Sequence, residues 1–203
     1  MPRRIGPSSP LLLASASPRR RELLELARVP YAIVEQNAAE DVIAGEAADA
    51  YVVRVTKAKL ASAAGGLSDA DRARGAVLLA ADTSVVLEGR VLGKPASDEE
   101  ATSMLRALSG RTHEVMTGFA LGEPDGGALL AERLVVTSVV FRPLVDEEVE
   151  AYVRSGEGRD KAGAYAIQGG ASAMIERIDG SATNVIGLPT CELVVELRRL
   201  GLL

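Results

Sequence analysis

The chain has 203 residues, of which 47% are hydrophobic and 25% are charged, the balance of a globular protein with an ample core. A net charge of −5, with 3% aromatic residues and no Trp, argues against a duplex-binding surface and against base-stacking nucleic-acid modules. One cysteine and one histidine exclude an intrachain disulfide and a multi-histidine metal centre. No apolar run approaches the ~18 residues of a membrane span, so we expect a cytoplasmic protein without nucleic-acid or membrane partners.

The N-terminus differs in composition from the rest of the chain. Residues 1–9 are rich in Pro, Ser and Arg, and the apolar run that follows them is too short for the core of a signal peptide. We therefore expect residues 1–9 to be a flexible leader. No internal repeat or low-complexity linker interrupts residues 10–203, which we expect to form a single domain.

A strand, a tight turn and a helix open the expected domain. The apolar run Leu11–Ala14 predicts the strand, Ser17 is a good N-cap, and Pro18 suits the first helical position. Arginines at 19–21 follow, beside the unpaired N–H groups of the helix start. Arginines in a first turn oppose the helix dipole, so helix stability does not explain them. We favour a site for an anion, above all a phosphate chain, over an exposed helix start with solvated arginines.

An aspartate follows the next buried strand. Residues 31–35 predict a strand and 47–64 a helix, whereas 67–75 is typical of a polar connection. The unbroken apolar run 76–81 predicts a strand that is buried on both faces and ends at Asp82. At a strand end Asp82 could bind Mg²⁺, accept a proton from water, or both, although an Asx turn explains it equally well.

A lysine in a rigid loop is the next candidate. Residues 85–92 predict a hairpin, and Lys94 follows it between Gly93 and Pro95. A lysine held in this way could neutralise a phosphate, and a solvated loop lysine is the alternative. No G-x-x-x-x-G-K-[ST] sequence occurs, so this is not a Walker loop. A helix over 97–108 follows, with a serine at its predicted N-cap.

The C-terminal half alternates strands with helices. Expected strands cover 112–121, 129–144 and 173–178, and expected helices cover 146–153 and 189–200. The chain is therefore an α/β protein with antiparallel segments, not a clean βαβ array. The apolar pattern of the last helix predicts that Cys191 is buried. The single histidine, His113, lies between strand-forming stretches, and we expect it to be structural.

A glycine-rich segment over 158–170 carries the last candidate ligands. It contains Lys161 and also Gln168, whose amide offers a donor and an acceptor suited to a nucleobase edge. An irregular surface loop is the alternative interpretation. Elsewhere, Glu40 and Asp41 could complete a divalent-metal site or simply form a solvated acidic loop.

Six motifs follow one another along the chain. They are A-S-A-S-P-R-R-R-E-L-L at 14–24, L-L-A-A-D-T at 78–83, L-G-K-P at 92–95, M-L-R-A-L-S-G-R-T-H-E-V-M-T at 104–117, D-K-A-G-A-Y-A-I-Q-G at 160–169 and N-V-I-G-L-P at 184–189. In this order they resemble the signature of the Maf, or septum formation, family. The resemblance covers nearly the whole chain after the leader.

The resemblance implies a fold and an activity. Maf proteins share an α/β fold related to that of the inosine triphosphate pyrophosphatases, with a mixed twisted sheet flanked by helices and a cleft between two lobes. They are nucleoside triphosphate pyrophosphatases, which use a divalent metal (Mg²⁺ or Mn²⁺) and release a nucleoside monophosphate and pyrophosphate. The sequence resembles the branch selective for dTTP and UTP, and modified pyrimidine triphosphates are further candidate substrates.

The resemblance also implies roles for single residues. Asp82 matches the family's proton acceptor and would bind the metal together with Glu40, while Lys94 would offset charge on the leaving pyrophosphate. Three positions match the residues that mark the dTTP/UTP branch: Arg19, Thr83 and Gln168. Phosphate binding would fall to five residues: Ser15, Ser17, Arg20, Lys59 and Lys161.

An alternative function belongs to another class. The family is named after a septation phenotype, so the chain could be a nucleotide-binding regulator of cell division whose catalysis is vestigial. The intact set of Asp82, Lys94 and Lys161 weighs against this alternative. The resemblance also allows a homodimer.

Overall fold

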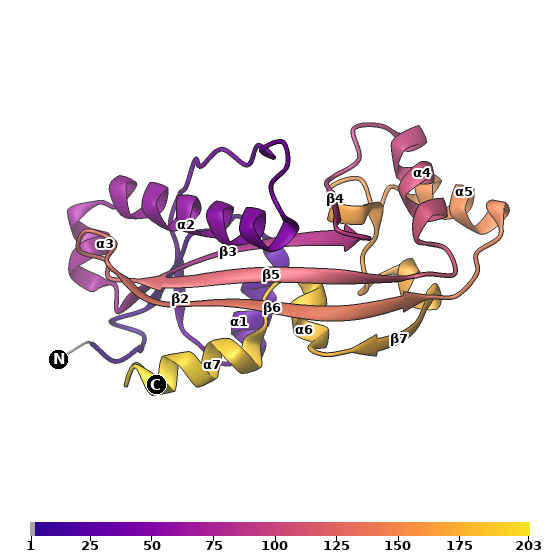
Figure 1. Ribbon diagram of the computed structural model, residues 1–203. Coiled ribbons are helices and arrows are strands. Elements are labelled where there is room, and N and C mark those ends of the chain that lie inside the picture. The colour runs from indigo at the N-terminus through magenta and orange to yellow at the C-terminus, as the bar shows by residue number, and fades with distance from the viewer. Residues whose placement is uncertain (1–2) are drawn as a thin grey trace. The chain divides into compact units, whose positions relative to one another are not determined.

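The computed structural model describes residues 3–203, so the first two residues of the expected leader lie outside the described part. The elements are β1 Leu11–Leu13, α1 Pro18–Leu26, β2 Tyr31–Ile33, α2 Ala48–Gly66, α3 Asp69–Arg74, β3 Val77–Leu87, β4 Arg90–Leu92, α4 Asp98–Leu108, β5 Thr112–Gly122, β6 Leu129–Phe141, α5 Asp146–Ser155, the short 3₁₀ turns η1 Ala162–Ala164 and η2 Gly170–Ala173, β7 Ile175–Asp179, α6 Ala182–Ile186 and α7 Thr190–Arg199. Within residues 3–203, seven strands form a mixed sheet in the order β2-β1-β3-β5-β6-β7, with β4 paired to β3 (Figure 1). The expected α/β class is confirmed. Over the same residues, no helix is both long and apolar enough to cross a membrane.

The described chain divides into two compact units. The first comprises the residues up to Asp82, 117–134 and 187–203, and the second comprises 83–116 and 135–186. Strands β3, β5 and β6 contribute residues to both units. The expectation of a single two-lobed domain after the leader stays a prediction.

In the first unit, β1 lies between two parallel neighbours. Leu12 is in register with Ala32 of β2 on one side and with Leu78 of β3 on the other. All three residues of β1 are fully buried, as expected of a parallel strand that is covered on both faces. Because the pairing is parallel, the loop that leaves β1 at Ser15 starts at the level where β3 approaches Asp82.

Helices α2 and α7 cover opposite faces of the strands in the first unit (Figure 1). Two adjacent residues of β6 demonstrate this, because neighbouring side chains of a strand point to opposite faces. Glu132 forms an ion pair with Lys57 of α2 at 2.9 Å. Arg133 instead forms an ion pair with Glu196 of α7.

A helix forms where a polar connection is predicted. Within residues 67–75 the chain folds into α3, although none of the helix's residues is buried. Ser68 Oγ accepts a hydrogen bond from the Asp71 N–H at 3.1 Å and caps the helix. Aspartates in the first turn and arginines in the last turn complement the helix dipole. The prediction is wrong because the cap and the charges form this helix without an apolar stripe.

Strand β3 continues past Asp82, so the prediction that the strand ends there is wrong. The strand pairs with β1 through residues 77–79 and with β4 through residues 85–87. The run predicted at 76–81 and the first arm of the predicted hairpin are therefore one strand. Asp82 lies between the two paired stretches, and it is only 5% exposed.

Part of the expected leader is hydrogen-bonded. Gly6 and Ser9 exchange two backbone hydrogen bonds of 3.0 Å. The Ile5 N–H donates to the Leu202 carbonyl at 2.8 Å, which joins the leader to the end of the chain. The flexibility expected of residues 1–9 stays a prediction.

Cys191 is exposed, so the prediction of its burial is wrong. The buried face of α7 is defined by Leu193 and Leu197, which lie four residues apart. Cys191 precedes Leu193 by two positions, and this spacing turns it away from that face. The apolar neighbours were the correct signal for the helix but not for this position.

The second unit has a core of its own under α4 and α5. As predicted, α4 begins at a serine cap, where Ser97 Oγ accepts a hydrogen bond from the Glu100 N–H at 3.2 Å. Helix α5 ends at Gly156, whose left-handed φ of 75° suits a helix C-terminus. The two helices contact each other (Figure 1). Leu105 of α4 and Phe141 of β6 are among the residues of the core.

The single histidine, His113, is buried against two aromatic rings of this core. Its ring is edge-on to those of Phe141 and Tyr165, with centroids 5.1 and 5.5 Å away. Its Nε2 forms a hydrogen bond with the Tyr165 hydroxyl at 2.8 Å. Nδ1 is buried and has no hydrogen-bond partner within the described chain. Burial lowers the pKa of His113 from 6.5 to about 4, because the charged imidazolium loses its hydration.

The lowered pKa of His113 predicts a loss of stability in mild acid. Between pH 6.5 and 4 the unfolded chain binds a proton at His113 that the folded chain does not bind. The contribution of neutral His113 to the free energy of unfolding is fully present above pH 6.5 and decreases as the pH falls. We expect the free energy of unfolding of the wild type to fall, relative to that of His113→Gln, by about 2 kcal/mol between pH 7.5 and pH 5. Urea unfolding at the two pH values measures this difference, and an equal pH dependence of both proteins would contradict it.

Candidate active site

Lys59 forms the centre of a charge cluster in the first unit. Its Nζ donates to Asp82 Oδ1 at 2.7 Å and lies 2.8 Å from Glu40 Oε1. The side chains of Lys59 and Asp82 are each 7% exposed, whereas that of Glu40 is 47% exposed. Lys57, two residues earlier on α2, pairs with Glu132 of β6, so the two lysines do not share a face of the helix. Burying an ammonium group and a carboxylate together avoids the large cost of burying either one alone.

Arg20 and Ser15 lie at the start of α1 in the same unit. Arg20 donates from Nε to the Gly187 carbonyl at 2.9 Å and from Nη1 to Ser15 Oγ at 3.2 Å. Burial lowers the pKa of Arg20, and the negative charges of Asp82 and Glu40 oppose this shift. The guanidinium is thus close enough to both carboxylates to sense their charge.

The loop between β1 and α1 is organised by Ser15 more than by Ser17. Ser17 occupies the N-cap position before Pro18, as predicted, but within the described residues its side chain makes no capping hydrogen bond. Its own N–H donates to Ser15 Oγ at 3.2 Å. Arg19 lies in the first turn of α1 and is partly buried.

Glu40 lies on an irregular loop between β2 and α2, and α2 supplies the contacts that hold this loop. The Tyr51 hydroxyl donates to the Glu40 carbonyl at 3.0 Å. Burial raises the pKa of Tyr51, and the nearby charges of Asp82 and Glu40 raise it further. Arg54 donates to the Asp41 carbonyl at 2.9 Å. Sequence reasoning missed Tyr51 and Arg54, although their spacing of three residues on a helix was a usable signal.

The two carboxylates of the cluster suit a hard divalent cation. Asp82 and Glu40 each direct an oxygen to the same Nζ, within 2.8 Å, so their oxygens converge on one small volume. Within residues 3–203 no group of three or more His, Cys, Asp or Glu side chains is arranged to hold a metal ion. Two carboxylates with substrate phosphates and water complete the coordination that Mg²⁺ prefers. The residues present therefore fit a divalent metal whose other ligands come from water or a bound anion.

Two predicted lysines lie on adjoining loops of the second unit. The Gly163 N–H donates to the Gly93 carbonyl at 3.0 Å, which joins the segment after Lys161 to the loop of Lys94. Gly163 has a φ of 68°, and a Cβ there would lie 2.9 Å from the Val85 side chain, so glycine is required for this approach. Lys94 is exposed, and Lys161 forms an ion pair with its neighbour Asp160.

Gln168 lies on an exposed turn that is anchored on both sides. Before it, the Ala166 N–H donates to the Tyr152 hydroxyl at 3.0 Å. After it, the Gly170 N–H donates to Glu157 Oε2 at 2.8 Å. These two bonds fix the backbone of the turn and leave the Gln168 side chain exposed.

The structure brings together five of the eleven predicted site residues. The first unit assembles Ser15, Arg20, Glu40, Lys59 and Asp82 around one charge cluster. The second unit holds Thr83, Lys94, Lys161 and Gln168, with Thr83 directly after Asp82 in β3. The roles assigned to these residues stay predictions.

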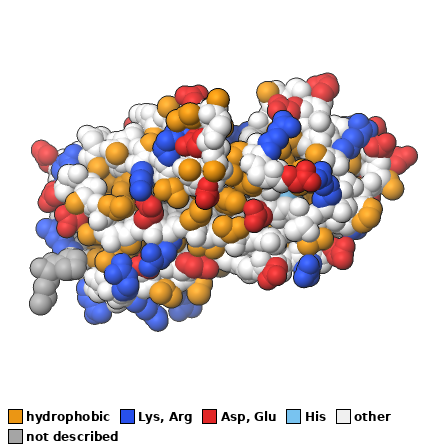
Figure 2. All heavy atoms as spheres, viewed as in Figure 1, with side chains coloured by type: hydrophobic (Ala, Val, Ile, Leu, Met, Phe, Trp, Pro, Cys, Tyr) orange, Lys and Arg blue, Asp and Glu red, His pale blue; other side chains and the backbone are white. Residues whose placement is uncertain are grey.

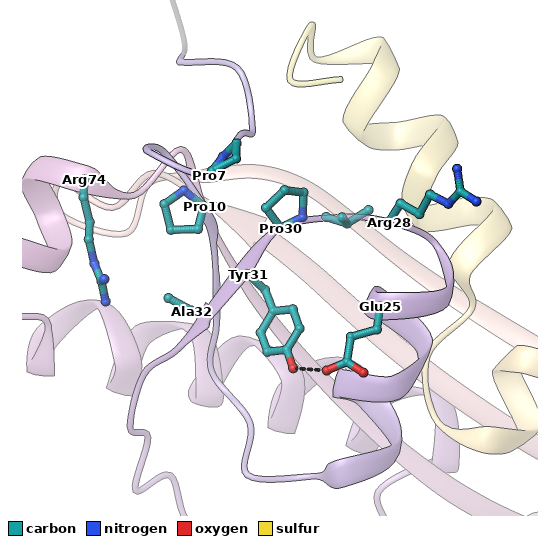
Figure 3. Close-up of a pocket in the computed structure, with 9 residues that line it drawn as sticks. Pro7, Pro10, Glu25, Arg28, Pro30, Tyr31, Ala32 and Arg74 are labelled. Atoms are coloured by element: carbon teal, nitrogen blue, oxygen red, sulfur yellow. Dashed lines mark hydrogen bonds between the residues drawn. The ribbon is translucent and has the colours of Figure 1, made fainter.

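The pocket in Figure 3 lies elsewhere in the first unit. Three prolines border it, Pro7, Pro10 and Pro30. At its edge the Tyr31 hydroxyl donates to Glu25 at 2.7 Å. None of the candidate site residues lines this pocket, so it is not part of the candidate active site.

A match to a known family covers nearly the whole chain. The family profile described as "Maf-like protein" matches residues 10–200. The chain belongs to the Maf family. This finding confirms the resemblance carried by the six motifs.

Curated relatives match this Maf protein over almost its full length. The dTTP/UTP pyrophosphatase of Geobacter sulfurreducens is 49% identical and covers 95% of this chain and 97% of its own. That of Myxococcus xanthus is 48% identical and covers 95% of this chain and 93% of its own. These alignments leave no large part of either relative unmatched.

Two solved structures resemble this Maf protein more distantly. A HAM1 protein from Coxiella burnetii is 18% identical, covers 79% of this chain and 88% of its own, and has a TM-score of 0.41. A nucleoside-triphosphatase, or dITP/XTP pyrophosphatase, from Mycobacterium abscessus is 18% identical, covers 64% and 72%, and has a TM-score of 0.35. TM-scores of this size support no conclusion about function, and the family assignment rests on the sequence matches alone.

Proposed function

We propose that this Maf protein hydrolyses dTTP and UTP to the nucleoside monophosphate and pyrophosphate. The observation that carries the proposal is the full-length match to relatives named dTTP/UTP pyrophosphatases, at 48–49% identity. The charge cluster around Lys59 supports it, because such a site can bind a polyphosphate and also supply a general base. A cytoplasmic location and a homodimer stay predictions.

In the proposed reaction, the first unit binds the phosphates and activates water. The Arg20 guanidinium, with the Ser15–Ser17 loop, binds the phosphate chain at the start of α1. Asp82 accepts the proton of the water that attacks the α-phosphorus. Lys59 holds the Asp82 carboxylate in place and adds positive charge.

Asp82 and Glu40 are the residues that would hold a divalent metal, Mg²⁺ or Mn²⁺. When bound, the metal would offset negative charge on the phosphate oxygens. For the metal to bind, Lys59 Nζ must give up at least part of its present contact with the two carboxylates. Its long, flexible side chain permits this movement.

In the second unit, Lys94 and Lys161 would offset charge on the leaving pyrophosphate. Substrate selection would rest on Arg19, Thr83 and Gln168. The exposed Gln168 amide, on its anchored turn, offers the paired donor and acceptor of a pyrimidine edge. Modified pyrimidine triphosphates that keep this edge are substrates under the same proposal.

A nucleotide panel tests both the activity and the choice of base. Wild-type protein with Mg²⁺ is expected to hydrolyse UTP and dTTP faster than CTP, ATP or GTP. Gln168→Ala is expected to lower kcat/KM for UTP by about 10-fold or more and for ATP much less, because only the pyrimidine edge loses its partner. Ser172→Ala, an exposed change nearby in η2, serves as the control.

Two outcomes of the panel count against the proposal. Absence of turnover with every nucleotide would contradict the proposed hydrolase and favour a nucleotide-binding regulator. An equal loss of kcat/KM for all nucleotides in Gln168→Ala would show that Gln168 does not select the base.

A further inference from the structure

The acidic loop of residues 36–46 carries Glu40 but is not held by hydrophobic burial. Its largest apolar side chains, Val42 and Ile43, are 60% and 55% exposed. In the described structure the loop is irregular, apart from one turn. Acidic and hydrophobic side chains gather on the surface over this loop in Figure 2. Polar contacts must therefore hold the Glu40 carboxylate beside Lys59.

Arg54 makes three of the polar contacts between α2 and this loop. Its guanidinium binds both carboxylate oxygens of Glu46, with Nε to Oε1 at 2.6 Å and Nη2 to Oε2 at 2.7 Å. Nη2 also donates to the Asp41 carbonyl at 2.9 Å, one residue after Glu40. Bidentate pairing of this kind fixes geometry as well as adding energy. The hydrogen bond from Arg54 keeps the pKa of Glu46 below its ordinary value.

Tyr51, one helical turn before Arg54 on α2, also contacts the loop. We call Arg54 and Tyr51 together the clamp. Its hydroxyl donates to the backbone carbonyl of Glu40 itself, at 3.0 Å. The Arg54 guanidinium lies over the Tyr51 ring, 5.6 Å from its centroid. The two side chains thus support each other and hold two successive carbonyls, those of Glu40 and Asp41. Neither side chain contacts Lys59 or Asp82 in the described hydrogen bonds and ion pairs.

We propose that Arg54, supported by Tyr51, is a positioning residue that holds Glu40 in the metal-binding cluster. The inference rests on the proposed function, since it assigns Arg54 a role through Glu40 in binding the metal–nucleotide substrate. Ordering the half-exposed Glu40 side chain on an irregular loop costs conformational entropy. Because the clamp already orders the loop in the free protein, this cost does not reduce the affinity for the metal and substrate. Residues that orient a metal ligand typically change metal affinity by about 10–100-fold when removed.

A double-mutant cycle between Arg54 and Glu40 tests the proposal. The readout is binding of Mn²⁺ by the protein with α,β-methylene-UTP, measured from the free Mn²⁺ signal in electron paramagnetic resonance. Arg54→Ala is expected to weaken Mn²⁺ binding by about 10-fold in the wild-type background. In a Glu40→Gln background the same substitution is expected to change binding by less than about 2-fold, because no carboxylate remains to be positioned.

Three further variants separate positioning from general damage. Arg54→Lys keeps the charge but loses the bidentate geometry, so its Mn²⁺ affinity should fall between those of the wild type and Arg54→Ala. Arg54→Glu with Glu46→Arg restores the pair in reverse and should recover part of the affinity. Arg74→Ala removes a comparable exposed pair, with Asp71 of α3, and should leave Mn²⁺ binding unchanged.

The outcomes distinguish this inference from the proposed function. Equal weakening by Arg54→Ala in both backgrounds, or none in the wild type, overturns the positioning role even if the wild type hydrolyses UTP. Lack of both turnover and Mn²⁺ binding in the wild type instead overturns the proposed function.

Discussion

Asp82→Asn is expected to lower UTP turnover by about 10²–10⁴-fold, the usual contribution of a positioned general base. Asn has nearly the same shape but cannot accept the proton of the attacking water. Because Asp82 is buried and bonded to Lys59, the substitution removes the base with little change in packing. Steady-state kinetics with UTP and saturating Mg²⁺ measure the loss. Asp125→Asn, in the exposed turn between β5 and β6, is the matched control.

Turnover of Asp82→Asn within a few-fold of the wild type would show that Asp82 is not the base. A large rise in the Mg²⁺ concentration needed, with kcat restored at saturation, would assign Asp82 to metal binding alone. The expected result is a loss of kcat that added Mg²⁺ does not restore.

Lys59→Met is expected to lower the free energy of unfolding by about 4 kcal/mol, because it removes the cation that is hydrogen-bonded to the buried Asp82 carboxylate. Methionine fills the space of the lysine stem, so the lost partner, not a cavity, causes the loss. Urea unfolding at pH 7.5 measures it. Lys57→Met, which removes the half-exposed pair with Glu132, should change stability by less than about 1 kcal/mol.

The double variant Lys59→Met with Asp82→Asn separates charge from packing. Replacing the orphaned carboxylate by an amide should restore most of the lost stability. Equal stability of Lys59→Met and the wild type would contradict the buried ion pair. A double variant as unstable as Lys59→Met would show that packing, not charge, is responsible.

Local signals predicted the start of the fold well. The apolar run at 11–14 and Pro18 after Ser17 place β1 and α1 correctly, because residues that are adjacent in the sequence specify both elements. The function of Ser17 was less predictable. Ser15 Oγ, two residues earlier, accepts the hydrogen bonds that organise this loop.

Longer-range features were harder to predict. Strand β3 runs on through Asp82 into the first arm of the hairpin predicted at 85–92, and the polar residues 82–84 conceal this continuity. Helix α3 depends on a cap and on charges, without an apolar stripe. In both cases hydrophobic periodicity alone gives the wrong boundary.

The candidate site was predicted as a set of residues but not as an arrangement. The motif at 78–83 identifies Asp82, and the family resemblance points to Lys59 and Glu40, yet no spacing indicates that one ammonium contacts both carboxylates. Such contacts join a helix, a loop and a strand that are distant in sequence. Arg54 escaped notice for the same reason, since its partners lie on the loop and not on its own helix.

Hydrolysis of UTP in oxygen-18 water tests the central claim most directly, because the label marks the phosphorus that water attacks. Attack at the α-phosphorus places one oxygen-18 atom in UMP and none in pyrophosphate. Mass spectrometry of the two products reads this outcome. Label in pyrophosphate, or formation of UDP and labelled orthophosphate, would contradict the proposed reaction.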